Sequence, residues 1–346
     1  MSRRTYFIDE GLGETRGGVL LDDRPERLLI QRDDDSQRLA LGARLRARVR
    51  HVEPALSMAF LDLGEGAEAS LSFKPDARPR QGEALEIEIR TEARVGKLAT
   101  ARLIGPAQGD PALLSPAPSL LDQLREMARD GELITGKAAR QIADEAEAEA
   151  LEILHPLPGG GSIAIEPTRA LTAIDVDVGE RKGSEAKRVT RQANLAALGV
   201  AARVLRLKGL GGLVVFDMAG RGHDGAALMA AARAAFNPDN PGVSIGPISR
   251  FGTIELTVPR RTRPVTDILT DASGRVSART LAQRLVRRME AEGRASPGGR
   301  LSGRCAPAVA EAAKPALALL AARIGARFEV SADPDAPWDR IEVHAR

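Results

Sequence analysis

The sequence predicts a multidomain α/β protein with a small closed β-barrel near its N-terminus. Its 346 residues are enough for two or three small domains. Short alternating segments from about 39 to 104, separated by Gly- and Pro-containing turns, indicate five strands of an OB-type barrel. Two later apolar runs, at 170–177 and 210–217, are each long enough for one buried strand, and each ends on a carboxylate.

Composition restricts the compartment and the class of protein. The chain is 43% hydrophobic and 28% charged, and its net charge of +3 suits a nucleic-acid partner without requiring one. No apolar run approaches the roughly 18 residues that cross a bilayer, and no apolar core of a secretion signal follows Arg3 and Arg4. The single cysteine, Cys305, excludes an intrachain disulfide and a cysteine-based zinc site within one chain. We therefore expect a cytoplasmic protein with no membrane partner.

The first hundred residues follow the strand period. Two or three short strands are expected before residue 35, at 5–8, 18–21 and 27–31. At 44–50 four arginines alternate with three apolar residues, which predicts a barrel strand with one basic face. The other barrel strands are expected at 58–64, 68–73, 84–90 and 98–103.

The rest of the chain mixes helices and strands. A Pro/Ala/Ser-rich connection at 106–118 precedes a helical hairpin, whose helices are expected at 120–129 and 138–153. Residues 158–262 read as strand, strand, helix, strand, helix, strand, with the first helix at 185–208. Beyond 263 we expect a loop, helices at 278–292 and 307–324 separated by a Gly/Pro/Ser linker at 295–303, and strands at 327–331 and 340–344. The expected boundaries are 1–35, 36–106, 107–157, 158–262 and 263–346.

The two carboxylate-ended strands are the first candidates for a functional site. Strands that are apolar on both faces are typical of a covered, mostly parallel sheet, in which ligands bind beyond the carboxyl ends of the strands. If the strands are neighbours, Asp175, Asp177 and Asp217 converge. Carboxylates packed so closely repel one another unless a cation lies between them, and hard oxygen ligands favour Mg²⁺. This predicts metal-assisted phosphoryl hydrolysis, although each aspartate alone could be a turn residue or a helix N-cap.

Residues 157–258 resemble the catalytic region of the ribonuclease E/G family. The resemblance is carried by blocks at 157–163, 170–177, 194–197, 205–217 and 248–255, in this order. It implies a DNase I-like α/β catalytic domain at 158–262, in which Asp175 and Asp217 hold one Mg²⁺ that Mn²⁺ could replace. Asp177 stands where the family usually has an asparagine. The added charge could tighten metal binding or supply a third ligand, or the change could remove a hydrogen bond.

The resemblance also implies contacts with RNA close to these carboxylates. Arg250 would clamp a phosphate and Phe251 would support a base, with a surface ion pair as the alternative for Arg250. Three residues at the start of the helix after the Asp175 strand are further expected RNA-binding residues: Arg188, Arg191 and Asn194. His223 follows Asp217 closely and could line the same edge.

Residues 52–64 and 96–97 resemble the RNA-binding barrel of this family. By that likeness Phe60 would stack on a base and Lys97 would meet a phosphate. Leu71 stands where a second stacking aromatic is expected, and Phe73 is a candidate substitute. The alternative for Phe60 is packing inside the barrel.

Other regions resemble reduced parts of the family's architecture. Residues 1–35 and 131–146 resemble portions of an RNase H-like domain, and 263–346 resembles a shortened small α+β C-terminal domain. The interval before the catalytic unit is too short for a domain that senses the RNA 5′ end. No cysteine lies between Arg260 and Ser277, where the family carries a zinc link between chains, so no zinc is expected and any oligomer would form without it.

Three functions follow from these observations. The first is a Mg²⁺-dependent endoribonuclease that cleaves single-stranded RNA, in RNA processing or decay, without sensing a 5′-monophosphate. The second is an RNA-binding protein of the same descent whose nuclease site has decayed. The third is a phosphodiesterase acting on a small nucleotide, with the barrel as an interaction module.

Overall fold

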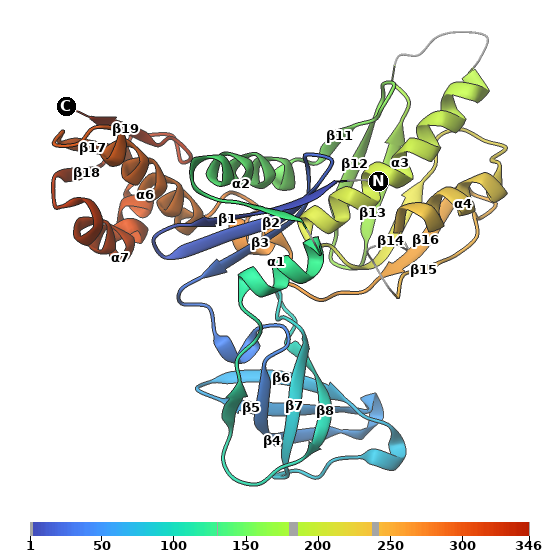
Figure 1. The fold of residues 1–346 in the computed structure, drawn as a ribbon. Coiled ribbons are helices and arrows are strands. Elements are labelled where there is room, and N and C mark those ends of the chain that lie inside the picture. Colours follow the sequence, from blue (N-terminus) through green and yellow to red (C-terminus); the bar gives the residue numbers. More distant parts are fainter. Residues whose placement is uncertain (1–2, 130, 180–185, 237–241, 346) are drawn as a thin grey trace.

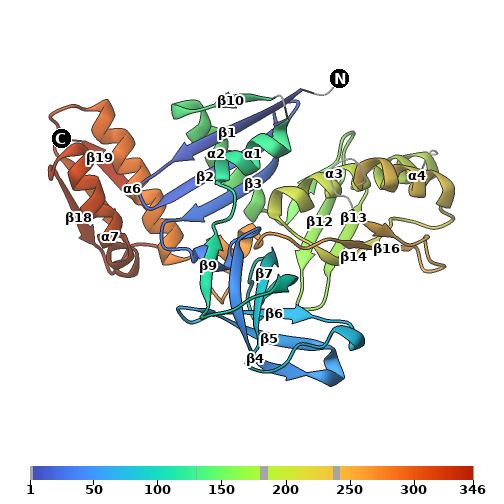
Figure 2. The same cartoon turned by 60° about the horizontal axis from the view of Figure 1, so that its bottom comes forward.

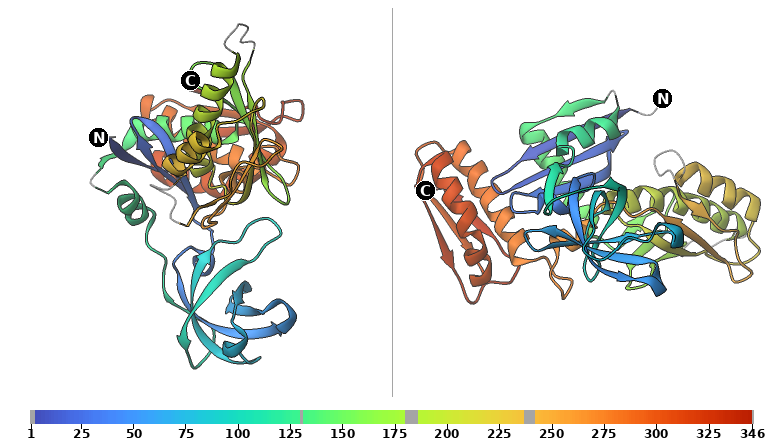
Figure 3. Two further views of the ribbon diagram at one scale, coloured as in Figure 1. Left: turned by 90° about the vertical axis from the view of Figure 1, so that its right-hand side faces the viewer. Right: turned by 90° about the horizontal axis from the view of Figure 1, so that it is seen from below.

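The computed structural model describes residues 3–129, 131–179, 186–236 and 242–345. A barrel projects from one side of a body that contains three further sheets (Figures 1 and 3). The body has the N-terminal sheet at its centre, a C-terminal unit on one side and a second α/β unit on the other (Figure 1). Within these described ranges no helix is both long and apolar enough to cross a bilayer.

The predicted five-stranded closed barrel is confirmed, and its form is consistent with the OB type. The strands are β4 (Arg44–Glu53), β5 (Met58–Gly64), β6 (Ala67–Ser72), β7 (Ala84–Thr91) and β8 (Ala99–Pro106). They close in the order β4-β5-β6-β8-β7-β4. In addition, β9 (Ala112–Ser115) pairs antiparallel with residues 44–46 at the start of β4. Alternate side chains fill the interior, with Leu45, Leu61 and Ile87 almost fully buried. Short 3₁₀ turns lie at Gln37–Leu39, Pro54–Leu56 and Pro75–Ala77.

The N-terminal sheet has the strand order β10-β1-β2-β3. Its strands are β1 (Arg4–Glu10), β2 (Glu14–Leu21), β3 (Arg24–Arg32) and β10 (Glu132–Ile134), and its helices are α1 (Leu120–Ala128) and α2 (Gly136–Leu151). The predicted helical hairpin is wrong, because β10 lies between the helices and pairs in parallel with β1. Tyr6 packs with α1 and Phe7 packs with α2. Since successive strand residues face opposite sides, each face of the sheet needs its own helix.

The second α/β unit is a six-stranded sheet with helices on one face (Figure 1). Its elements are β11 (Leu154–Pro156), β12 (Ser162–Pro167), β13 (Thr172–Asp177), α3 (Ala186–Lys208), β14 (Gly212–Asp217), α4 (Gly225–Phe236), β15 (Ser244–Ile245) and β16 (Thr253–Val258). The predicted covered parallel sheet is wrong, because among the strand pairs of the described residues only β13–β14 is parallel. Ile174, Val214 and Phe216 are buried beneath the helices, whereas Asp175 and Asp217 are exposed on the open face.

The C-terminal unit contains a strand that sequence reasoning missed. Its elements are α5 (Val265–Leu269), α6 (Ala278–Ala295), β17 (Leu301–Cys305), α7 (Pro307–Ile324), β18 (Phe328–Ala332) and β19 (Glu342–Ala345). The expected linker at 295–303 is wrong, because β17 begins at Leu301 and forms the centre of the sheet β18-β17-β19. Leu301 and Cys305 are buried in the core that α6 and α7 cover.

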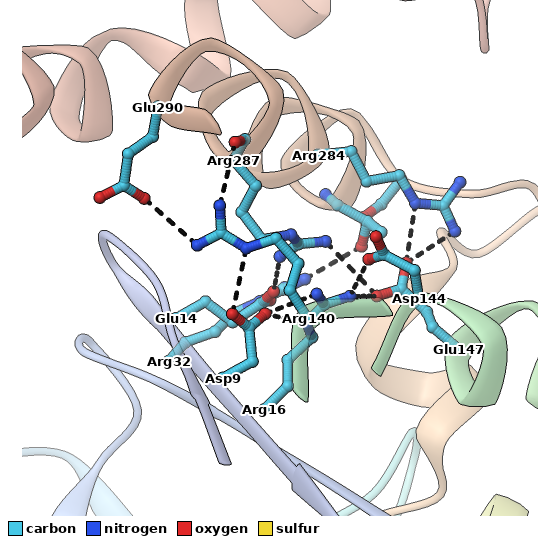
Figure 4. Close-up of polar contacts among 12 residues, drawn as sticks. Asp9, Glu14, Arg16, Arg32, Arg140, Asp144, Glu147, Arg284, Arg287 and Glu290 are labelled. Carbon is cyan, nitrogen blue, oxygen red and sulfur yellow. Dashed lines mark hydrogen bonds and ion pairs between the residues drawn. The ribbon is translucent and has the colours of Figure 1, made fainter. Parts of the chain in front are cut away.

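A buried network of charged side chains joins the N-terminal sheet, α2 and α6 (Figure 4). Arg16 is fully buried, and its guanidinium meets Asp9 at 2.6 Å, Asp144 at 2.7 Å and Glu147 at 2.8 Å. From α6, Arg284 contacts Glu147 at 2.7 Å. The network therefore holds the C-terminal unit against the N-terminal sheet.

Candidate active site and RNA-binding surface

Asp175 and Asp217 lie side by side at the ends of β13 and β14. Their Cα atoms are direct partners in the parallel register, and neighbouring strands are about 4.8 Å apart. Both side chains are exposed on the face of the sheet that α3 and α4 leave uncovered. Neither carboxylate forms a hydrogen bond or ion pair with any described residue. Two carboxylates this close, with no cation between them, repel each other.

Asp177 does not complete a cluster of three carboxylates. It lies on the same face of β13 two residues after Asp175, and its Oδ1 accepts a hydrogen bond from the Gly179 amide at 2.9 Å. In the ranges that the structure describes, no group of three or more His, Cys, Asp or Glu side chains could hold a metal ion. The expected convergence of three aspartates is therefore wrong, and a pair remains.

The pair fits a divalent cation of the Mg²⁺ type. Mg²⁺ is usually held in proteins by one or two carboxylates, and it keeps several waters or phosphate oxygens as its other ligands. Asp175 and Asp217 supply two hard oxygen donors without competing hydrogen bonds from the described part of the chain. This donor set suits an ion that also contacts a phosphate.

Arg250 and Phe251 form the tip of a turn next to the end of β14. The turn is closed by the Ser249 amide donating to the Thr253 carbonyl at 2.8 Å, and Thr253 is the partner of Asp217 across the sheet. Both tip residues are exposed, and Phe251 retains 76% of its accessible surface. The Arg250 guanidinium carbon lies 4.6 Å from the centre of the Phe251 ring. Arg250 has no carboxylate partner among the described residues, so the alternative of a surface ion pair is not found.

His223 packs beneath this turn. Gly252 has φ +90°, and a Cβ atom there would lie 3.1 Å from Nε2 of His223. That nitrogen is buried without a hydrogen-bond partner in the described part of the chain. The Gly252 carbonyl in turn accepts a hydrogen bond from the Met218 amide at 3.1 Å, directly after Asp217. The His223 ring therefore supports the segment that carries Arg250.

The predicted RNA-binding residues of α3 have different environments. Asn194 is 2% exposed, and its amide group both donates to and accepts from the Ala219 backbone at 3.0 Å. The prediction that Asn194 contacts RNA is therefore wrong, because this side chain instead ties α3 to the loop after β14. Arg191 is exposed and forms an ion pair with Asp224 at 3.0 Å, and Arg188 is exposed one turn earlier.

Phe60 lies on the outside of the barrel. It alternates with the buried Ala59 and Leu61 on β5, which rules out the alternative in which it fills the interior. Its ring is nearly parallel to that of His51, with the centroids 6.1 Å apart. The residue opposite Phe60 on β6 is Ser70.

The candidate second aromatics on the barrel do not join Phe60. Leu71 is buried in the barrel core, and Phe73 is partly buried against the same core. Lys97, by contrast, is exposed in the turn between β7 and β8. Phe60 and Lys97 thus both lie on the outside of the barrel, without a second aromatic at Leu71.

The four arginines of β4 are engaged within the barrel itself. Arg44 pairs with Glu86, and Arg50 pairs with Glu68. The other two hold neighbouring loops by donating to backbone carbonyls, Arg46 to Gln108 at 2.9 Å and Arg48 to Gly82 at 3.1 Å. The predicted basic face exists, but its charges are largely matched by acceptors.

Comparison with known proteins supports the resemblance of the α/β unit. Residues 121–261 match the Ribonuclease E/G family. The chain is 41% identical over 108 residues to Ribonuclease E of Haemophilus influenzae and 40% identical over 108 residues to Ribonuclease E of Escherichia coli. These matches cover 30% of this chain, and 11% and 10% of those relatives. A chloroplastic ribonuclease E/G-like protein of Arabidopsis thaliana is 32% identical over 132 residues, 35% of this chain and 13% of that protein. The matched stretch thus spans roughly a tenth of the relatives' length, and residues 121–261 of this chain are similar to the ribonuclease E/G family.

Proposed function

We propose that this protein is a Mg²⁺-dependent endoribonuclease that cleaves single-stranded RNA. The observation that carries the proposal is the in-register pair Asp175 and Asp217 on an open sheet face, beside the exposed tip of Arg250 and Phe251. The relatives matched in this region are named ribonucleases. An OB-type barrel with an outward aromatic suits single-stranded RNA, whose unstacked bases are free to stack on protein rings.

Asp175 and Asp217 would hold the cation, which Mn²⁺ could replace. When bound, the cation would supply Lewis-acid chemistry at the scissile phosphodiester. Arg250 would bind a phosphate oxygen through its forked donors, and Phe251 would support an adjacent base. Phe60 would stack on a base further along the strand, and this would keep the RNA extended across the molecule.

The roles of the other predicted contact residues follow from their exposure. Lys97 would contact a phosphate, and Arg188 and Arg191 would contact the RNA backbone near the start of α3. The ion pair of Arg191 with Asp224 would have to open or share its guanidinium.

We infer that cleavage does not depend on the phosphorylation state of the RNA 5′ end. The segment between the barrel and the second α/β unit consists of β9, α1, β10 and α2, and these elements belong to the barrel and the N-terminal sheet. The described residues of this segment form no further domain. Cleavage rates on 5′-monophosphate and 5′-hydroxyl RNA should therefore be similar, and a large preference for the monophosphate would contradict the inference.

The first test is cleavage of an end-labelled A/U-rich single-stranded RNA with Mg²⁺ or with EDTA. Asp217→Asn should lower the rate by about three orders of magnitude, because it removes one of two charged ligands. Asp177→Asn is the matched control: the same chemical change, two residues along the strand from Asp175. The control should retain most of the activity. Equal rates for Asp217→Asn and the unaltered chain would contradict the proposal.

A second function is an RNA-binding protein without nuclease activity. It is favoured by the small donor set, since no described residue adds a third metal-ligating side chain to Asp175 and Asp217. In that case the unaltered chain would bind the same RNA and leave it intact with either Mg²⁺ or Mn²⁺. Asp217→Asn would then bind RNA at least as tightly, because it removes a negative charge.

A further inference from the structure

A cluster of basic side chains lies where the barrel meets the second α/β unit. We call it the basic junction, and it consists of Arg94 and Lys97 from the turn between β7 and β8, and Arg260 and Arg261 from the segment after β16. Figure 2 shows the barrel next to the segment that leaves β16. The turn is closed by reciprocal backbone hydrogen bonds between Arg94 and Lys97, at 3.1 and 2.9 Å.

Three hydrogen bonds hold this turn against the segment after β16. The Glu92 amide donates to the Arg261 carbonyl at 2.8 Å, and the Arg263 amide donates to Glu92 Oε2 at 2.9 Å. The Val95 amide donates to Asp267 Oδ2 at 3.2 Å. Because these bonds bracket Arg94, the barrel cations keep a fixed position beside Arg260 and Arg261.

Arg260 is seated on the first residue of β14. Its Nε donates to the Gly211 carbonyl at 2.9 Å, and a Cβ at Gly212 would overlap the guanidinium. The absence of a side chain at Gly212 therefore makes room for the arginine. Burial lowers the pKa of Arg260, and the nearby charge of Arg94 lowers it further. The remaining guanidinium nitrogens of Arg260 have no partner among the described residues.

No described carboxylate forms an ion pair with the four cations of the basic junction. The side chains of Arg94, Lys97 and Arg261 form no ion pair or hydrogen bond with the rest of the described chain. Glu92 and Asp267 carry two negative charges close to this turn, but their carboxylates accept hydrogen bonds from backbone amides and not from these cations. Four positive charges therefore face two negative ones. Positive charges fixed side by side in this way are unfavourable alone and favourable around a polyanion.

We propose that the basic junction binds consecutive phosphates of the RNA strand on its way from the barrel to the Asp175–Asp217 pair. This proposal rests on the proposed function. Gly212 and Asp217 are the two ends of β14, about 17 Å apart at the rise of a β-strand. A phosphate bound beside Arg260 would thus lie a few nucleotides from the cleaved bond. The basic junction would thus set the number of nucleotides between the bound phosphate and the cleaved bond.

The test is the salt dependence of RNA binding, measured in EDTA so that cleavage plays no part. Fluorescence anisotropy of a labelled single-stranded RNA would be recorded over a series of salt concentrations. For the double variant Arg94→Gln/Arg260→Gln, the slope of log affinity against log salt should become shallower by about 1.4, since each phosphate contact contributes roughly 0.7. Affinity at moderate salt should fall by about tenfold. Arg94→Gln alone, with Arg260 still seated, should give about half the change in slope.

The matched control removes the same two charges elsewhere. Arg233→Gln/Arg300→Gln alters exposed arginines of α4 and of the loop before β17, and its slope should stay close to that of the unaltered chain. Equal slopes for the two double variants would overturn the proposal while leaving the nuclease function standing. Absence of RNA binding by the unaltered chain would overturn both. Competition by polyglutamate as effective as by RNA of equal charge would overturn the assignment to phosphates.

Discussion

Asp175 and Asp217 are direct partners across the parallel strand pair β13–β14 of the second α/β unit. This arrangement predicts a stability effect that is separate from catalysis. Mg²⁺ at ten times its dissociation constant should stabilise the unaltered protein by about 1.4 kcal/mol. Asp217→Asn should lose this effect, and without Mg²⁺ it should be slightly more stable, because the repulsion between the carboxylates is gone. Thermal denaturation with Mg²⁺ and with EDTA measures both effects. An equal rise in melting temperature on adding Mg²⁺ in the two proteins would contradict Mg²⁺ binding at Asp217.

Gly252 gives a second prediction through its contact with His223. Gly252→Ala should destabilise the protein by about 2 kcal/mol, since it forces a side chain into φ +90° and places its Cβ 3.1 Å from the imidazole. Gly222→Ala is the control, because its φ is +70° but its Cβ would meet open space. Its cost should be about 1 kcal/mol. Urea unfolding gives both values. Cleavage should fall more for Gly252→Ala, since Arg250 moves with the turn.

The barrel aromatics should separate RNA binding from stability. Phe60→Ala should weaken binding of single-stranded RNA by about 1–3 kcal/mol, the value of one stacked base, with little change in the free energy of unfolding. Phe73→Ala should do the opposite, because Phe73 is partly buried against the barrel core. Anisotropy titrations and denaturant unfolding on the two variants measure the contrast. If Phe73→Ala lost RNA affinity and Phe60→Ala did not, the prediction that Phe60 stacks on a base would be wrong.

The buried ion network predicts an acid-sensitive fold. Burial acts to raise the pKa of Glu147, but the neighbouring guanidiniums, with Arg287 first among them, outweigh it and lower the pKa below 4.5. Because the pKa is lower in the folded state, the network's contribution is complete above about pH 4.5 and is lost as the pH falls further. Glu147→Gln should cost about 3–5 kcal/mol at pH 7, since Arg16 and Arg287 lose a buried partner.

The pH dependence distinguishes this network from ordinary surface pairs. Urea unfolding from pH 3 to pH 7 should show a flatter profile for Glu147→Gln than for the unaltered chain. Glu311→Gln is the control, because Glu311 pairs with Lys314 at 2.5 Å on an exposed helix face. Exposed pairs contribute only about 0–1 kcal/mol. If Glu147→Gln lowered the free energy of unfolding by no more than Glu311→Gln, the buried network would not be needed for stability.

The sequence predicted local structure better than it predicted sheet pairing. The alternation at 44–50 placed β4 correctly, and the apolar runs placed β13 and β14. The prediction of a covered, mostly parallel sheet was wrong because Ala173 and Val215 are apolar although they lie half-buried on the open face. Small apolar residues there make a one-sided strand look two-sided.

Partners distant in sequence account for the other errors. The charges of Arg44 and Arg50 are matched by Glu86 and Glu68, which no local pattern connects with them. β17 was missed because it is short and contains Gly303, and its pairing depends on strands that follow it in the chain. Asn194 was assigned to RNA because sequence position placed it near the carboxylates. Only the fold shows its side chain turned toward Ala219.

The ion network also bears on how the chain folds as it is synthesised. Glu14 and its partner Arg287 are 273 positions apart (Figure 4). Leu12 packs into the core formed by α6 and α7. The N-terminal hairpin leaves the ribosome long before α6 exists, so Glu14 can pair with Arg32 but not yet with Arg287 while most of the chain is made. The β1–β2 hairpin therefore reaches its final state only after α6 has been made, and a nascent chain stopped before α6 would leave Glu14 and Glu147 without Arg287 and Arg284.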